Sequence, residues 1–173
     1  PDQLFVLRLD ANGAADTGFA GDGIAQPACP LAGTSCSASA LLSARRELGG
    51  GFYMRRIFIA VNQGTRGGVL ALQNDGTLDP DFADAGHLDL FREEGTRINA
   101  LALRRDQRLV AAGSINPNGS GDGDFFAARS DFDGSLDPTF DGNGVNRYTF
   151  GEVAPSIDAA NAMVLSAERA VLV

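Results

Sequence analysis

The 173-residue sequence contains no lysine and no tryptophan, and its only histidine is His87. All 14 basic residues are arginine, and 22 acidic residues outnumber them, which gives a formal charge of −8. This acidic balance argues against a nucleic-acid-binding surface. No apolar run approaches the length that spans a bilayer, so we expect no transmembrane segment.

The sequence also lacks any sustained helical periodicity. Of its 22 acidic residues, 17 are Asp, which is a poor helix former and a common turn residue, and 22 further residues are Gly. Hydrophobic residues still make up 44% of the chain, enough to bury a core. This composition predicts an all-β protein with many turns.

One pattern recurs in residues 5–24, 69–88 and 126–145: an apolar strand, Asn-Gly or Asp-Gly, and then Asp, Phe and Gly. The first Gly supplies the positive φ that a tight turn needs, and the Asp carboxylate accepts backbone N–H bonds. The Phe is interpreted as an anchor in the hydrophobic layer. The pattern assigns a structural role to Gly13, Gly76, Gly134, Asp16, Asp79, Asp137, Phe19, Phe82 and Phe140.

A weaker hairpin pattern follows each of these segments, so that one repeat unit comprises about four short strands. The units extend over residues 4–62, 68–115 and 125–173, and each runs from the third strand of a blade through the fourth, first and second. Two insertions interrupt the first unit, a cysteine loop at 26–39 and a Gly-rich segment at 45–55.

Three arginines also recur at the start of a strand, where each could pair with a neighbouring acid. They are Arg56, Arg108 and Arg169.

The turn sequences Asp-Gly-Ser-Leu-Asp-Pro-Thr-Phe at 133–140 and Asp-Gly-Thr-Leu-Asp-Pro-Asp-Phe at 75–82 resemble the delta-60 repeat family of bacterial proteins, as does the strand at 108–113. The chain departs from that family in lacking the Asp-Gly of a second turn, and in having Ala14-Ala15 in the first unit. The resemblance implies β-propeller-like blades on a secreted, periplasmic or cell-surface protein. It implies no established activity.

The expected fold is therefore all-β, a β-propeller-like array of about three four-stranded antiparallel blades. Because propellers usually close with four to eight blades, we expect the chain to be part of a larger propeller. Exposed sheet edges would then be covered by the remaining blades of a longer chain or by another copy of this one. The missing initiator Met and the apolar end at 169–173 also suggest a piece of a longer protein.

Cys29 and Cys36 lie in a short loop with two prolines. Two cysteines that close such a loop predict a local disulfide, and hence an oxidising compartment. Two free thiols are the alternative, whereas a metal site would lack further His or Cys ligands.

Calcium is the only cofactor that the sequence suggests. Oxygen-bearing residues alternate around two turn glycines, in a spacing that resembles part of a calcium loop. Turn chemistry accounts for the same residues, so both interpretations stay open. The residues are Asp131, Asp133, Asp137, Asp10, Asn12 and Asp16.

No nucleophile elbow, zinc-binding His pair or P-loop is present, and His87 aligns with Ile24 and Val145 of the other units, as a variant strand residue. We therefore expect a non-enzymatic scaffold or binding module for a glycan or protein ligand. The alternative is a carbohydrate-binding or hydrolytic propeller domain with its site at the central channel. That site would draw on loop carboxylates such as Asp81, Asp84, Glu93, Glu94 and Asp141.

Overall fold

The computed structural model describes residues 3–30, 35–90, 95–116, 123–150, 158–166 and 169–173. These residues form strands and turns, with no helix among them. Accordingly, the described part of the chain has no helix of the length and apolar character that would cross a membrane. The all-β prediction is confirmed.

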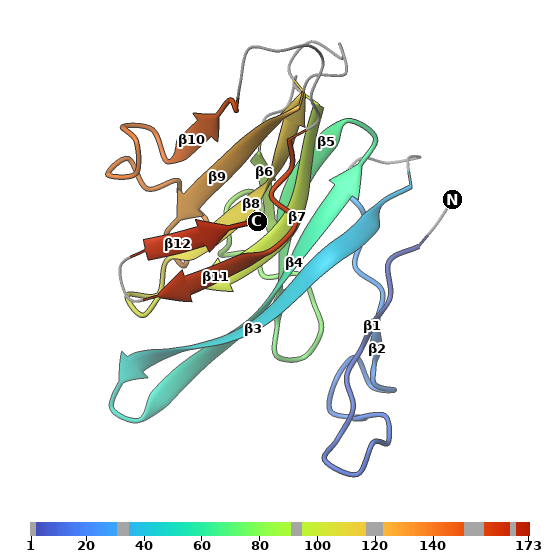
Figure 1. Ribbon diagram of the computed structural model, residues 1–173. Helices are drawn as coiled ribbons and strands as arrows, with labels where there is room; N and C mark the ends of the chain where they lie inside the picture. The colour runs from blue at the N-terminus through green and yellow to red at the C-terminus, as the bar shows by residue number, and fades with distance from the viewer. Residues whose placement is uncertain (1–2, 31–34, 91–94, 117–122, 151–157, 167–168) are drawn as a thin grey trace.

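Two complete four-stranded antiparallel sheets form the middle of the chain (Figure 1). The first has the order β3 (Ser37–Gly49), β4 (Phe52–Gln63), β5 (Arg66–Gln73) and β6 (His87–Leu90). The second has the order β7 (Gly95–Leu103), β8 (Leu109–Asn116), β9 (Asp124–Ser130) and β10 (Val145–Tyr148). In each sheet the strands pair in chain order, as in the blade of a propeller.

A two-stranded sheet lies at each end of this pair of blades. The N-terminal half-blade is β1 (Val6–Leu7) with β2 (Ile24–Ala25), and the C-terminal half-blade is β11 (Met163–Ser166) with β12 (Arg169–Leu172). The repeat pattern aligns β1 and β2 with β5 and β6, and it aligns β11 and β12 with β3 and β4. Among the described residues, the two half-blades are separate two-stranded sheets that do not pair with each other (Figure 1).

The blades pack face to face through apolar side chains. In β5, successive side chains point to opposite faces of the sheet. Val69 and Ala71 lie in the core shared with the β7–β10 blade, whereas Leu70 and Leu72 lie in the core shared with the N-terminal half-blade. Both faces of this strand are covered, which explains why residues 69–72 form an uninterrupted apolar run.

Residues 45–55, expected from the sequence to be a Gly-rich insertion, extend the two paired strands β3 and β4. The ladder between them runs from Ser37 opposite Asn62 to Gly49 opposite Phe52, with two irregularities. The turn itself is short, and its three glycines 49–51 all have positive φ. Cross-strand hydrogen bonding therefore converts most of this segment into a long hairpin.

Candidate functional site

The repeated turns have one backbone conformation in all three units. Their glycines have left-handed φ angles of +84°, +93° and +91° at Gly13, Gly76 and Gly134. A residue with a side chain adopts such angles only with strain, which is the reason that Gly recurs.

The conserved geometry extends to the Asp that follows each glycine. The backbone N–H of Asp16, Asp79 and Asp137 donates to the carbonyl eight residues earlier, at 2.9 Å in every unit. Each carboxylate in turn accepts the N–H two residues further on. These donors are Gly18 at 2.9 Å, Asp81 at 3.0 Å and Thr139 at 2.9 Å.

An arginine neutralises each of these carboxylates, and in two units it comes from the preceding strand. Arg8 Nε lies 2.8 Å from Asp16, and Arg129 Nε lies 2.6 Å from Asp137. Each guanidinium also covers the Phe ring of its own turn, at 4.7 Å for Phe19 in the first unit. The Arg, Asp and Phe of a unit therefore act together to close the turn.

The middle unit uses a different arginine, because Ala71 occupies the place of Arg8. Arg56 of β4 supplies the charge instead, with Nε 2.5 Å from Asp79. The third unit has both positions filled, since Arg108, the equivalent of Arg56, lies 3.1 Å from Asp137. The expected pairing with an acid is thus present at Arg56 and Arg108, although Arg56 lies inside β4 and Arg108 directly precedes β8.

The Asp137 carboxylate is strongly stabilised in its charged form. A hydrogen bond from the Thr139 hydroxyl, together with the Thr139 N–H and the Arg129 guanidinium, lowers the pKa of Asp137 to about 2. A carboxyl group with this pKa is ionised at neutral pH and cannot donate a proton as a general acid. Its role is to hold the turn.

Each turn also contacts the turn of the next unit, and we call this the turn-to-turn contact. Phe19 and Phe82 are completely buried. A Cβ placed on Gly76 would lie 3.0 Å from the Phe19 ring, and one on Gly134 would lie 2.9 Å from the Phe82 ring. Only glycine allows this approach, so the same residue serves both the φ angle and the contact.

A backbone hydrogen bond accompanies each turn-to-turn contact. The N–H of Ala20 donates to the carbonyl of Asp75 at 2.8 Å, and the N–H of Ala83 donates to that of Asp133 at 2.7 Å. The remaining phenylalanine and the remaining turn glycine differ from these pairs. Phe140 of the third unit is only partly buried, and Gly13 of the first unit has no atom within 4 Å of its Cβ position.

The inner strands of neighbouring blades are joined in a repeated way as well. The Ser39 hydroxyl of β3 donates to the Ile98 carbonyl of β7, and the Asn99 amide of β7 donates to the Ala160 carbonyl at 3.1 Å. Ser39 and Asn99 both lie at an irregularity of their strand, which turns the side chain toward the next blade.

The carboxylates of the calcium hypothesis have partners within the protein, namely turn N–H groups, hydroxyls and arginines. One Asp10 oxygen accepts the N–H groups of Asn12 and Ala14, and one Asp133 oxygen accepts both the N–H and the hydroxyl of Ser135. Across the parts of the chain that the structure describes, no three acidic, His or Cys side chains gather in a cluster that could hold a metal ion. Calcium binding by these residues stays a hypothesis, and their contacts are those of turns.

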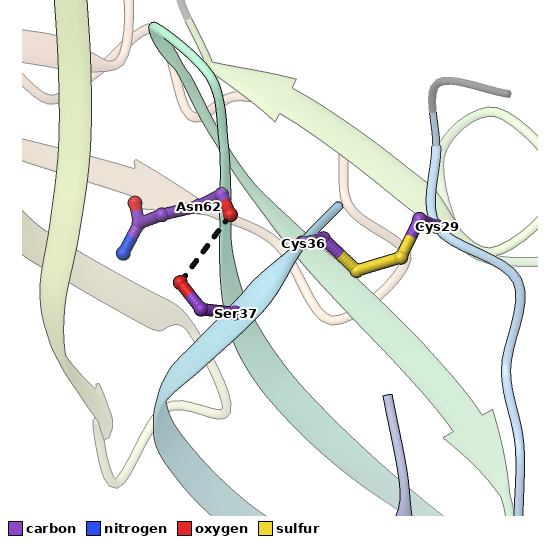
Figure 2. The surroundings of a disulfide bond; sticks show 4 residues. All are labelled: Cys29, Cys36, Ser37 and Asn62. Atoms are coloured by element: carbon purple, nitrogen blue, oxygen red, sulfur yellow. Dashed lines mark hydrogen bonds between the residues drawn. A yellow bond between two sulfur atoms is a disulfide. The ribbon is translucent and has the colours of Figure 1, made fainter. Parts of the chain in front are cut away.

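The expected disulfide joins Cys29 to Cys36 and confirms that prediction. It connects the segment after β2 to the residue before β3, where the neighbouring Ser37 hydroxyl donates to the Asn62 carbonyl at 3.5 Å (Figure 2). Cys36 is buried and Cys29 packs against the same hydrophobic cluster, between the N-terminal half-blade and the β3–β6 blade. The bond therefore fastens these two units together.

A cavity of about 400 Å³ lies beside β6, the outer strand of its blade. Its lining includes Pro30 of the cysteine loop, Asp84, His87 and the ion pair of Arg66 with Asp89, whose charged atoms are 3.2 Å apart. The Nε2 atom of His87 is buried and makes no hydrogen bond to any described residue. This cavity offers both a positive and a negative charge to a small polar ligand.

The sequence did not identify Arg66 or Asp89 as members of a site, because only the pairing of β5 with β6 brings them together. Of the carboxylates expected at a central channel, Asp84 lines the cavity beside β6. Asp81 and Asp141 are exposed turn residues outside its lining. Glu93 and Glu94 lie outside the described residues.

The comparisons with known proteins agree with this architecture. A family model described as a β-propeller domain of unknown function (DUF5122) matches residues 105–140, which include β8, β9 and the turn of the third unit. No curated protein and no solved structure matches the chain. The match supports a β-propeller-like repeat family without singling out delta-60 repeats. The chain is an all-β protein of propeller-like blades, and its residues 105–140 resemble a β-propeller domain of unknown function.

Proposed function

We propose that this chain is a non-enzymatic β-propeller module that acts as a rigid scaffold and binding module outside the cytoplasm. The observation that carries this proposal is the use of its Arg–Asp pairs. Each pair closes a repeated turn, and the Arg56–Asp79 pair is buried among the phenylalanines of the blade core. The Arg56 guanidinium also donates to the Phe132 carbonyl in the turn of the next unit, so this buried pair holds two blades together.

The carboxylates that the turns stabilise support the same view. In Asp75, Asp133 and Asp137, a hydrogen bond from a Thr or Ser hydroxyl two residues along lowers the pKa. Enzymes that use a carboxyl group as a general acid need the opposite shift, a raised pKa. The carboxylates of these three residues are therefore suited to holding turns.

The disulfide supports a location in an oxidising compartment. Disulfides persist in secreted, periplasmic and surface proteins and are rare in the cytosol. The Cys29–Cys36 bond joins two structural units, so its formation contributes to the fold. The disulfide thus supports the proposed secreted, periplasmic or cell-surface location.

The cavity beside β6 is the candidate ligand site of this module. Its Arg66–Asp89 pair can form hydrogen bonds to a polar ligand, while His87, Pro30 and Leu88 supply further contact surface. A glycan fits this mixture of charged and apolar groups, as does a short polar segment of a protein. The second candidate function is a carbohydrate-binding or hydrolytic domain, which would use this cavity beside the outer strand β6 in place of the central channel expected from the sequence.

A glycan array combined with a broad hydrolase assay tests both functions. The matched variant is His87→Val, because the third unit has Val145 at the equivalent position and folds around it. We expect ligand binding that His87→Val weakens, with no hydrolysis by either protein. Hydrolysis that is lost in His87→Val would contradict the non-enzymatic proposal and favour the second candidate.

A further inference from the structure

The β3–β4 hairpin is longer than its counterpart in the second blade. Beyond the cross-strand pair Ser43–Ile57 the first blade has 13 residues, whereas beyond the aligned pair Leu103–Leu109 the second blade has five. The eight additional residues lengthen each strand by four, which extends the hairpin by about 13 Å. The hairpin therefore reaches past the ends of β7 and β8 (Figure 1).

One face of this extension is held against the body of the protein. Met54 packs against the core that the two complete blades share. Its cross-strand partner is Arg46, whose guanidinium lies 5.6 Å from the centre of the Phe132 ring. These contacts support the hairpin near its base, while its tip and its opposite face remain exposed.

The tip of the hairpin is apolar. Leu48 is 56% exposed and Phe52 is 74% exposed, and the three residues between them are all Gly. No side chain from 48 to 52 carries a hydrogen-bonding group, so these side chains cannot recognise a polar ligand. The next residue is Tyr53, which is also exposed and whose ring has one apolar and one polar end. This composition suits a boundary between water and an apolar medium.

Two arginines lie directly opposite each other behind the tip. Arg45 of β3 pairs with Arg55 of β4 in the ladder, and both side chains are exposed. Like charges in this position destabilise a sheet. Arg45 lies over the Tyr53 ring at 4.0 Å, and neither guanidinium forms an ion pair with a described residue. The pair therefore offers two positive charges to an anion outside the protein.

The charge of the extension is opposite to that of the chain. Residues 45–55 contain three arginines and one glutamate, a net charge of +2, whereas the whole chain carries −8. Salt screens charges over about 8 Å at physiological ionic strength, which is less than the ~13 Å by which the hairpin is extended. An anionic surface at the tip is thus attracted by the arginines and largely screened from the acidic body.

We propose that the β3–β4 hairpin docks this protein on the surface of a membrane that contains anionic lipids. Leu48 and Phe52 enter the boundary between headgroups and acyl chains, with Tyr53 at the level of the headgroups. Arg45 and Arg55 bind the lipid phosphates. The β3–β4 ladder continues to the tip, so cross-strand hydrogen bonds satisfy much of the backbone that enters the boundary.

A tryptophan placed at the tip tests this proposal, because the sequence has no other tryptophan. Phe52→Trp should bind vesicles of phosphatidylcholine mixed with phosphatidylglycerol, and its fluorescence emission should shift to shorter wavelength on binding. The control is Phe5→Trp, because Phe5 is 57% exposed next to β1, far from the hairpin tip in the sequence, and its emission should not change. If the emission of Phe52→Trp is already shifted without vesicles and vesicles do not change it, protein covers the tip and the proposal fails.

Co-sedimentation with the same vesicles separates the two parts of the hairpin. Phe52→Ser and the double variant Arg45→Gln/Arg55→Gln should each weaken binding by about tenfold or more. The matched control is Arg97→Gln/Arg105→Gln, which removes two exposed arginines elsewhere and should bind as the wild type does. Equal losses in the two double variants, or no wild-type binding, would overturn the proposal. Binding to an anionic polysaccharide but not to vesicles would overturn it in favour of a glycan.

Discussion

The Nε atom of Arg56 lies 2.5 Å from a carboxylate oxygen of Asp79, and the two side chains are only 3% and 6% exposed. The same guanidinium donates to the carbonyl of Phe132, in the turn of the next unit. One arginine therefore connects a strand, the turn of its own blade and the turn of the following blade. Its removal should affect the whole array.

Replacement of Arg56 by Met should lower the free energy of unfolding by about 3–5 kcal/mol, because the Asp79 charge stays buried without a partner. Arg8→Met removes the partly exposed arginine partner of Asp16 in the first unit and should lower the free energy of unfolding by only about 1 kcal/mol. Urea denaturation of both variants measures the difference. The double variant Arg56→Met/Asp79→Asn should recover part of the loss, and strict additivity of the two changes would contradict the pairing.

The titration of Asp137 should make the fold sensitive to acid between about pH 4 and pH 2. Its pKa falls from 3.8 to about 2 on folding, chiefly through the Thr139 hydroxyl, so its stabilising effect is full above pH 4 and is lost as the pH falls through 2. Thr139→Val should raise the pKa of Asp137 toward 3.8. The free energy of unfolding should then change less between about pH 4 and pH 2. NMR titration of the carboxyl carbon measures the pKa, with Thr77→Val as a control that leaves Asp137 unchanged. An Asp137 that titrates near 3.8 in the wild type would refute the assignment.

Replacement of Gly134 by Ala tests the turn-to-turn contact inside one chain. The new Cβ would lie 2.7 Å from Ala83 Cβ and 2.9 Å from the Phe82 ring. Gly21→Ala is the control, since its φ of +87° is similar and its Cβ position is open. Both variants strain the backbone by about 1 kcal/mol, and overpacking should cost Gly134→Ala a further ~1–3 kcal/mol. Equal urea midpoints for Gly134→Ala and Gly21→Ala would show that the turn-to-turn contact accommodates the extra methyl group without loss of stability.

Removal of the disulfide should lower the free energy of unfolding by about 2–3 kcal/mol, the value expected for closing a loop of this length. The cysteines are seven residues apart, and Cys36 is buried at the contact between the N-terminal half-blade and the β3–β6 blade. A phosphine reductant should destabilise the wild type and leave Cys29→Ala/Cys36→Ala unaffected. If the reductant changed the free energy of unfolding of the wild type and of the double variant equally, or of neither protein, the predicted role of the disulfide would be contradicted.

Calcium should leave the melting temperature unchanged, because the turn carboxylates already bind backbone N–H groups and arginines. Asp10 and Asp133 accept hydrogen bonds within their own turns, and Asp131 lies 3.2 Å from Arg108. Thermal unfolding in excess calcium and in chelator measures this directly. A clear rise of the melting temperature with calcium would favour the cation-loop interpretation of these residues.

The local features of the fold could be predicted from the sequence because their interactions span few residues. The turn glycine and its Asp act within a dozen residues of each other, and the disulfide closes a short loop, so composition and spacing indicate them. The secondary structure of residues 45–55 was harder to predict from the sequence. Its glycines predict a turn, but only the pairing of β3 with β4 shows that the flanking residues are strands.

The candidate site was harder to predict, because it depends on which strands become neighbours. His87 was identified as unique but was assigned to the strand alone, whereas the structure places it in a cavity with Arg66 and Asp89. Arg66 and Asp89 are 23 positions apart in the sequence and belong to adjacent strands of one sheet. No spacing rule within a single strand connects them.

The sequence by itself determined where the chain turns, because glycine conformation and Asp hydrogen bonding are local properties of a few residues. It also determined that three units share one pattern. Tertiary structure decided which arginine neutralises each turn, taking Arg56 from a neighbouring strand where Ala71 replaces the usual residue. It also decided that two complete blades form, with a separate two-stranded sheet at each end of the pair, since strand pairing and face-to-face packing join residues far apart in the chain.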